Sequence, residues 1–135
     1  MNHYQRAVRK HRMWFGSYKR SGELKKIPVW CFLHNGNLEF LTPGESYKVK
    51  RILRNPRVVC TLGSENGPEV EGTAEVVRNP DEVRRGYAAY RKTHPWLMLL
   101  LGRMIRKRME SGRQLMIWTK PDEPNPFAGI TEPFS

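Results

Sequence analysis

The sequence predicts a mainly β protein with accessory helices, built as a six-stranded, mostly antiparallel barrel. Short apolar runs are separated by turn residues, which is typical of strands joined by hairpins. Polar and apolar side chains alternate over residues 69–76, so one face of this strand is expected to contact water. Asn35-Gly36 joins two further apolar runs and predicts a tight hairpin, because both residues tolerate positive φ.

The order of elements follows from these patterns along the chain. Strands are expected over residues 13–19, 24–33, 37–42, 57–62, 69–76 and 113–119. A helix is expected after the third strand and ends before Pro56. A longer helical stretch over residues 79–110 is expected to break at His94-Pro95. We interpret residues 1–135 as one domain, with an N-terminal arm (1–12) and an extended, proline-rich tail (120–135).

The second expected strand, residues 24–33, is apolar on both of its faces. A strand buried on both sides of a small barrel needs a cover over its outer face, so we expect a second subunit or a bound cofactor there. Pro28 lacks an N–H group, which places it at a sheet edge or a bulge.

The start of the first long helix is the most informative segment. Thr42 could cap it, with Pro43 at the first helical position and Glu45 three residues after the cap, whereas Ser46 is a competing cap. A helix start offers free backbone N–H groups and the positive end of the helix dipole to a phosphate. The alternative is an ordinary solvated helix with an apolar stripe, formed by Val49, Ile52 and Leu53.

The same segment adds polar side chains that suit an anion. Thr42 and Ser46 supply hydroxyl donors, and Lys48 and Arg51 supply positive charge one turn apart. We therefore predict a phosphate site over residues 42–51.

A family resemblance rests on the run IPVWCFLHNGNLEFLTPGESYKVKRILRNPRVVCTL followed by VEGTAEVV. In order and spacing it resembles the pyridoxamine-phosphate-oxidase-like proteins, which have an FMN-binding split β-barrel fold. It is most similar to their deazaflavin-dependent branch, through a PVW strand, a hairpin and the pattern T-x-x-x-S-x-K-V-K-R-x-x-x-N-P. The resemblance covers residues 13–78.

The resemblance implies a cofactor site and a partner. It implies phosphate binding by Thr42, Ser46 and Lys48, with Tyr47, Lys50 and Arg51 alongside, and a tricyclic ring lying along Pro28, Val29 and Trp30. It implies a homodimer that holds the cofactor at the subunit interface. Coenzyme F420 is favoured and FMN is second, because Cys31 stands where the flavin oxidases carry a basic residue.

The activity implied is hydride transfer to an unsaturated or quinone-like small molecule, in which the cofactor ring does the chemistry. We therefore name no catalytic side chain, and the scattered His and Cys residues predict no metal site. A cofactor carrier without turnover remains an alternative. Cys31 and Cys60 are interpreted as buried free thiols in a reducing cytoplasm, and the N-terminus lacks the apolar run of a signal peptide.

The formal net charge of +11 requires anionic partners or a solvated basic face. A small-barrel nucleic-acid binder is the alternative of another class, although it would not need the T-x-x-x-S-x-K spacing. Basic residues crowd residues 83–109 around the apolar run 96–101. We interpret this stretch as an amphipathic cover, or as a surface for the anionic tail of a deazaflavin or for a membrane.

Overall fold

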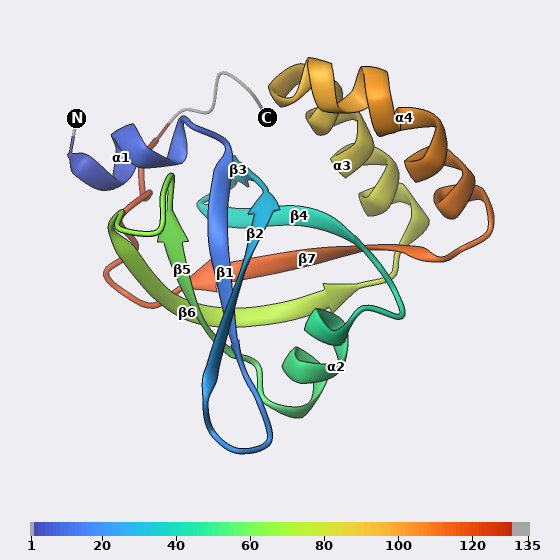
Figure 1. Ribbon diagram of the computed structural model, residues 1–135. Helices are drawn as coiled ribbons and strands as arrows, with labels where there is room; N and C mark the ends of the chain where they lie inside the picture. Colours follow the sequence, from blue (N-terminus) through green and yellow to red (C-terminus); the bar gives the residue numbers. More distant parts are fainter. Residues whose placement is uncertain (1, 131–135) are drawn as a thin grey trace.

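The structure, a computed structural model, describes residues 2–130, which form a curled β-sheet flanked by helices (Figure 1). In this part of the chain the elements are, in order, α1 (His3–Val8), β1 (Arg12–Tyr18), β2 (Leu24–Trp30), β3 (Phe32–His34), β4 (Asn37–Pro43), α2 (Tyr47–Arg54), β5 (Arg57–Leu62), β6 (Glu69–Val77), α3 (Pro80–Thr93), α4 (Pro95–Glu110) and β7 (Gln114–Pro121).

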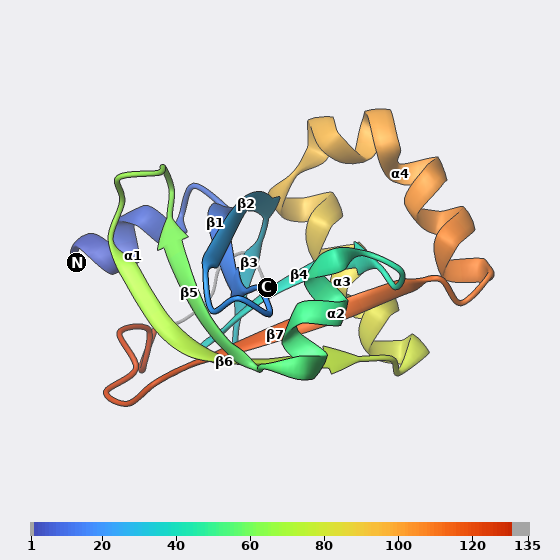
Figure 2. The same cartoon turned by 60° about the horizontal axis from the view of Figure 1, so that its bottom comes forward.

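The strands form one antiparallel sheet in the order β2-β1-β5-β6-β7-β4-β3. The first and last strands of this order, β2 and β3, follow each other directly in the chain. The sheet therefore curls until its two ends meet at a bend in a single strand, which gives the half-open barrel visible in Figures 1 and 2. A mainly β barrel with accessory helices is confirmed.

The described residues form seven strands, so the predicted count of six is wrong. The expected strand 24–33 is divided at Cys31, whose N–H group donates to the carbonyl of His11 (3.0 Å) and not to a sheet ladder. Before this bend β2 pairs with β1, and after it β3 pairs with β4. Pro28 lies on the edge strand β2 opposite Trp14, as its missing N–H group predicts.

Within a single chain, the first part of this run is not buried on both faces. In β2 the side chains of Pro28 and Trp30 are exposed, with 46% of Trp30 accessible to solvent. Only the residues from Cys31 to Leu33 are completely buried. The chain by itself therefore leaves the outer face of β2 open.

The core fills the inside of the curled sheet. Phe15, Phe32 and Phe40 are fully buried. The rings of Phe15 and Phe40 pack edge to face, with their centres 4.9 Å apart. The predicted hairpin is confirmed, because Asn35 and Gly36 join β3 to β4 with φ values of 51° and 79°. This hairpin fixes the register of β4, which carries Thr42.

Helix α2 begins after Ser46 and not after Thr42. Thr42 is the sixth residue of β4, and Ser46 takes the extended conformation of a helix N-cap. The strand pairing of Thr42 with Leu115 holds its backbone in the sheet and overrides its capping preference. The predicted apolar stripe also loses one member, since 63% of Leu53 is exposed whereas Val49 and Ile52 are buried.

The predicted extended tail, 120–135, differs from the structure where the structure describes it. Strand β7 continues to Pro121, and the chain then turns back towards the β3–β4 hairpin. The side-chain amide of Asn125 donates to the carbonyl of Gly36 (2.9 Å), and Phe127 is buried in the core. Residues 131–135 lie outside the described residues.

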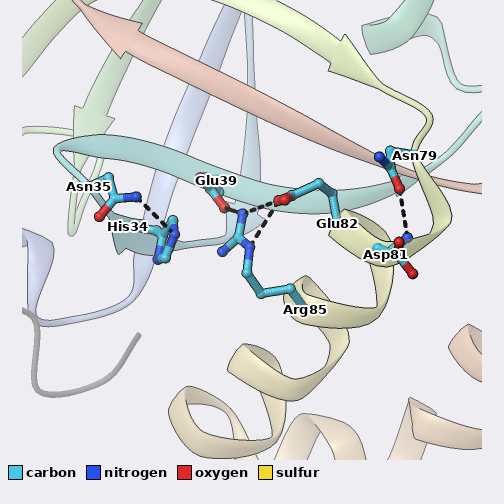
Figure 3. A network of polar contacts seen from close by, with 7 residues as sticks. All are labelled: His34, Asn35, Glu39, Asn79, Asp81, Glu82 and Arg85. Atoms are coloured by element: carbon cyan, nitrogen blue, oxygen red, sulfur yellow. Dashed lines mark hydrogen bonds and ion pairs between the residues drawn. The ribbon is translucent and has the colours of Figure 1, made fainter.

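Helices α3 and α4 lie together on one side of the sheet (Figures 1 and 2), and the predicted break at His94 is confirmed. Helix α3 is held to the sheet by Arg85, whose guanidinium donates to the buried carboxylate of Glu39 on β4 (2.7 Å; Figure 3). Glu82 binds the same guanidinium from within α3. No helix of residues 2–130 is long and apolar enough to cross a membrane.

Candidate functional site

A cavity of about 200 Å³ lies where β2, β4, the start of α2 and helix α4 come together. Its walls bring together segments that are far apart in the sequence. They are formed by Pro28, Val29, Trp30, Leu41, Thr42, Pro43, Lys48, Tyr90, Leu97, Leu101, Met104, Ile105, Arg108 and Gln114.

One end of the cavity is polar and carries the predicted phosphate residues. The side-chain oxygens of Thr42 and Ser46 are 3.2 Å apart, so the two hydroxyls form one small cluster at the end of β4. Lys48 follows on the first turn of α2 and is half-buried. Burial, with the nearby charge of Arg51, lowers the pKa of Lys48 below its usual range.

The side-chain ammonium group of Lys48 has no hydrogen bond or ion pair within residues 2–130. A half-buried ammonium group without a carboxylate is costly unless an anion binds it. The polar end of the cavity therefore fits a phosphate, which would accept from the ammonium and from the two hydroxyls.

A second cation reaches the cavity from α4 and was not predicted as a site residue. The Arg108 guanidinium donates through Nε to the side-chain oxygen of Gln114 (2.7 Å), which is buried at the start of β7. The sequence marked Arg108 only as one member of a basic run. Its position in the cavity depends on how α4 packs, for which the local sequence gives no signal.

The other end of the cavity is apolar. Pro28, Val29 and Trp30 form the wall that belongs to β2. The facing wall comes from α4 and consists of Leu97, Leu101, Met104 and Ile105. A flat, apolar ring system would be desolvated between these two walls.

The structure separates the nine predicted residues into two groups. Six of them meet at this cavity. Five line it directly, and the sixth, Ser46, has its hydroxyl beside that of Thr42. Tyr47, Lys50 and Arg51 instead line a second cavity of about 270 Å³ on another side of α2, together with Lys19, Arg20 and Arg54. There the Lys50 ammonium lies 5.3 Å from the centre of the exposed Tyr47 ring. Binding of the cofactor by these three residues stays a prediction of the sequence alone, and the phosphate site proposed below does not include them.

Tyr90 of α3 forms the floor of the candidate cavity and ties its walls together. Its hydroxyl donates to the carbonyl of Trp30 (2.7 Å) and accepts from the N–H group of Leu41 (3.0 Å). It therefore links β2 to β4 beside the bend at Cys31, and burial raises its pKa well above the usual range. Sequence reasoning missed this residue, because both of its partners are long-range backbone groups.

His94 fixes the same corner from the junction between α3 and α4. It is buried, and its Nε2–H group donates to the carbonyl of His11 (2.6 Å). The pKa of His94 is lowered, chiefly by burial. The hydrogen bond to the His11 carbonyl raises this pKa, and the charge of the His11 ring lowers it. Burial also lowers the pKa of His11.

We expect the protein to lose stability as the pH falls below about 6.5, the ordinary pKa of histidine. In that range the unfolded chain binds protons that the folded His94 resists, so unfolding is favoured by acid. The urea midpoint should fall between pH 8 and pH 5, and His94→Gln should flatten this decline. His3→Gln, at an exposed histidine, serves as the control. An unchanged pH dependence in His94→Gln would rule out this role.

No group of three or more His, Cys, Asp or Glu side chains that could hold a metal ion occurs within residues 2–130. Cys31 and Cys60 are buried free thiols, and burial raises the pKa of Cys60 to about 12.

Comparison with known proteins identifies the fold. No protein-family model and no curated protein matches the sequence. Among solved structures, an F420 reductase matches with a TM-score of 0.60 and 17% identity, over 90% of this chain and 94% of that one. A candidate pyridoxamine 5'-phosphate oxidase from Listeria innocua matches with a TM-score of 0.62 and 14% identity, over 89% and 91% of the two chains.

The heme storage protein HutZ from Vibrio cholerae matches with a TM-score of 0.67 and 10% identity, over 89% of each chain. The chain therefore has the split β-barrel fold found in these pyridoxamine-phosphate-oxidase-like structures. At such low identity the likeness concerns the fold alone.

Proposed function

We propose that this protein is an oxidoreductase that binds coenzyme F420 in the cavity between β2, β4 and α4. The substrate class proposed is an unsaturated or quinone-like small molecule. One observation carries the proposal: a half-buried lysine and a hydroxyl pair stand at one end of a cavity whose other end is apolar. The F420 reductase among the structures of this fold supports the choice of cofactor.

The residues present fit the parts of such a cofactor. Lys48 would bind its phosphate together with the Thr42 and Ser46 hydroxyls, and Arg108 would add a second positive charge. The walls from β2 and α4 would orient the ring and exclude water from it. The bound cofactor supplies the hydride, so the protein's contribution is position and electrostatics.

FMN is the second choice of cofactor. The position at which the flavin oxidases carry a basic residue is occupied here by Cys31, which is fully buried and points no charge at a ligand. Burial also raises the pKa of this thiol, so it stays neutral.

We also propose that the protein acts as a homodimer, in which a second copy covers β2. Support comes from the open outer face of that strand. A cavity of about 450 Å³ lies there, lined on β1 and β2 by Arg12, Met13, Trp14, Pro28, Val29 and Trp30. The same strand forms one wall of the candidate site, so a subunit seated on it would lie beside the cofactor. We propose a cytoplasmic location, because free thiols persist in a reducing compartment and both cysteines are free and buried.

Titration with purified F420 and with FMN tests the cofactor proposal. F420 should bind at micromolar concentration and FMN more weakly, followed by the fluorescence of each ring. If neither binds below millimolar concentration, the proposal is wrong.

Turnover is tested separately, with reduced F420 and a water-soluble naphthoquinone. If reduced F420 is oxidised faster with the protein than without it, the protein is an enzyme. Tight binding without oxidation supports a carrier. A nucleic-acid binder predicts instead that single strands bind without any cofactor, with an affinity that falls steeply with salt.

A further inference from the structure

The outer face of α4 exposes large apolar side chains that nothing in residues 2–130 covers. Trp96 is 77% exposed, Leu99 73% and Leu100 80%. Their spacing of three and four residues places them on one side of the helix. A contiguous exposed apolar group of this kind marks an interaction surface.

Basic side chains border this apolar group. A groove of about 420 Å³ runs between α3 and α4, and it is lined by Tyr87, Arg91, Pro95, Met98, Leu99, Gly102, Arg103 and Arg106. Arg91, Arg103 and Arg106 are exposed and take part in none of the ion pairs found within residues 2–130. Leu99 lies in the same groove as these three guanidinium groups. Apolar and cationic side chains are therefore adjacent on one surface.

We propose that this surface binds the face of an anionic lipid bilayer. Trp96, Leu99 and Leu100 enter the boundary between headgroups and acyl chains, and the three arginines bind lipid phosphates. An amphipathic helix with tryptophan and leucine on one side and basic residues beside them suits this position in the plane of the interface. Each basic side chain near a negatively charged leaflet adds to the attraction.

Charge selects the bilayer over the other possible occupants. A second copy of the chain packed symmetrically on this face would place two sets of Arg91, Arg103 and Arg106 in one interface. Such like charges repel, whereas anionic headgroups neutralise them. A nucleic acid would also neutralise the arginines, but its phosphate backbone gives no reason to bury Leu99 and Leu100.

The apolar side of α4 continues from this surface to the candidate cofactor cavity. Leu101 and Met104 line that cavity and are still 40% and 44% exposed. A lipophilic substrate dissolved in the bilayer would thus reach the cavity along one helix. This consequence rests on the proposed function, whereas the attachment to lipid does not.

Co-sedimentation with vesicles tests the attachment without any cofactor. The full chain should bind vesicles of phosphatidylcholine and phosphatidylglycerol (3:1) and bind pure phosphatidylcholine at least tenfold more weakly. The triple variant Trp96→Gln/Leu99→Gln/Leu100→Gln should bind the anionic vesicles at least tenfold more weakly than the unmodified chain. Leu53→Gln, which removes an exposed leucine on α2, should bind as the unmodified chain does.

The charge component has its own matched pair. Arg91→Gln/Arg103→Gln/Arg106→Gln should weaken binding at least tenfold. Arg9→Gln/Lys25→Gln/Arg78→Gln removes the same number of exposed charges elsewhere and should weaken binding less than threefold. Circular dichroism of each variant should match the unmodified chain, because all these positions are exposed.

Three results would overturn the proposal. If the apolar triple variant binds anionic vesicles normally, the attraction is electrostatic only. If both charge variants weaken binding equally, the basic groove has no special part in it. If sedimentation velocity shows that the apolar triple variant breaks a dimer, this face is a subunit interface. Because no cofactor is added, failure here leaves the F420 titration unaffected.

Discussion

Replacing Lys48 by methionine should weaken F420 binding about thirtyfold. Lys48 is half-buried and has no ion pair within residues 2–130, so a bound phosphate would be its main anionic partner. A hydrogen bond to a charged group contributes about 2 kcal/mol, which corresponds to a factor of about thirty in Kd. Adding Ser46→Ala should weaken binding further, because it removes one of the two clustered hydroxyls. Equilibrium titration by F420 fluorescence measures both effects.

Lys50→Met is the matched control for this prediction. It makes the same chemical change two residues away, at an exposed lysine that lines the second cavity with Arg51 and Arg54. It should change Kd less than threefold. A larger loss in Lys50→Met than in Lys48→Met would move the phosphate site to the other side of α2.

Replacing Arg85 by methionine should destabilise the fold by about 3 kcal/mol. The Glu39 carboxylate is buried on β4, and the Arg85 guanidinium is its cationic partner at 2.7 Å. Removing Arg85 leaves the desolvation cost of the buried Glu39 charge less well compensated. Urea unfolding measures the loss of free energy, and the double variant Glu39→Gln/Arg85→Met, which removes both charges of the pair, should recover part of it.

Arg84→Met is the control for this stability prediction. Arg84 pairs with Asp81 on the same helix, but both side chains are largely exposed. Such surface pairs contribute less than about 1 kcal/mol. Equal losses of unfolding free energy in Arg84→Met and Arg85→Met would show that the Arg85–Glu39 ion pair stabilises the fold no more than a surface pair does.

Local patterns in the sequence predicted most of the fold. Asn35-Gly36 gave the hairpin, the alternation over 69–76 gave β6, and His94-Pro95 gave the break between α3 and α4. The bend at Cys31 was missed because its cause is a hydrogen bond to His11, twenty residues earlier in the chain. A continuous apolar run carries no mark of such a long-range partner.

The candidate site could be predicted only in part for the same reason. The hydroxyls and the lysine follow one another in the sequence, so their motif is visible there. The α4 wall, the Tyr90 floor and Arg108 come from packing between distant segments. The spacing of the motif also could not decide which cavity each residue of α2 would line. In the structure Lys48 lines the candidate cavity, whereas Tyr47, Lys50 and Arg51 line the second one.

A crystal structure of the protein with F420 tests the central claim most directly. We predict that the phosphate lies within hydrogen-bonding distance of Lys48 Nζ and the Thr42–Ser46 hydroxyls, with the ring against Pro28, Val29 and Trp30. A phosphate bound among Lys50, Arg51 and Arg54, with the cavity beside α4 empty, would contradict it.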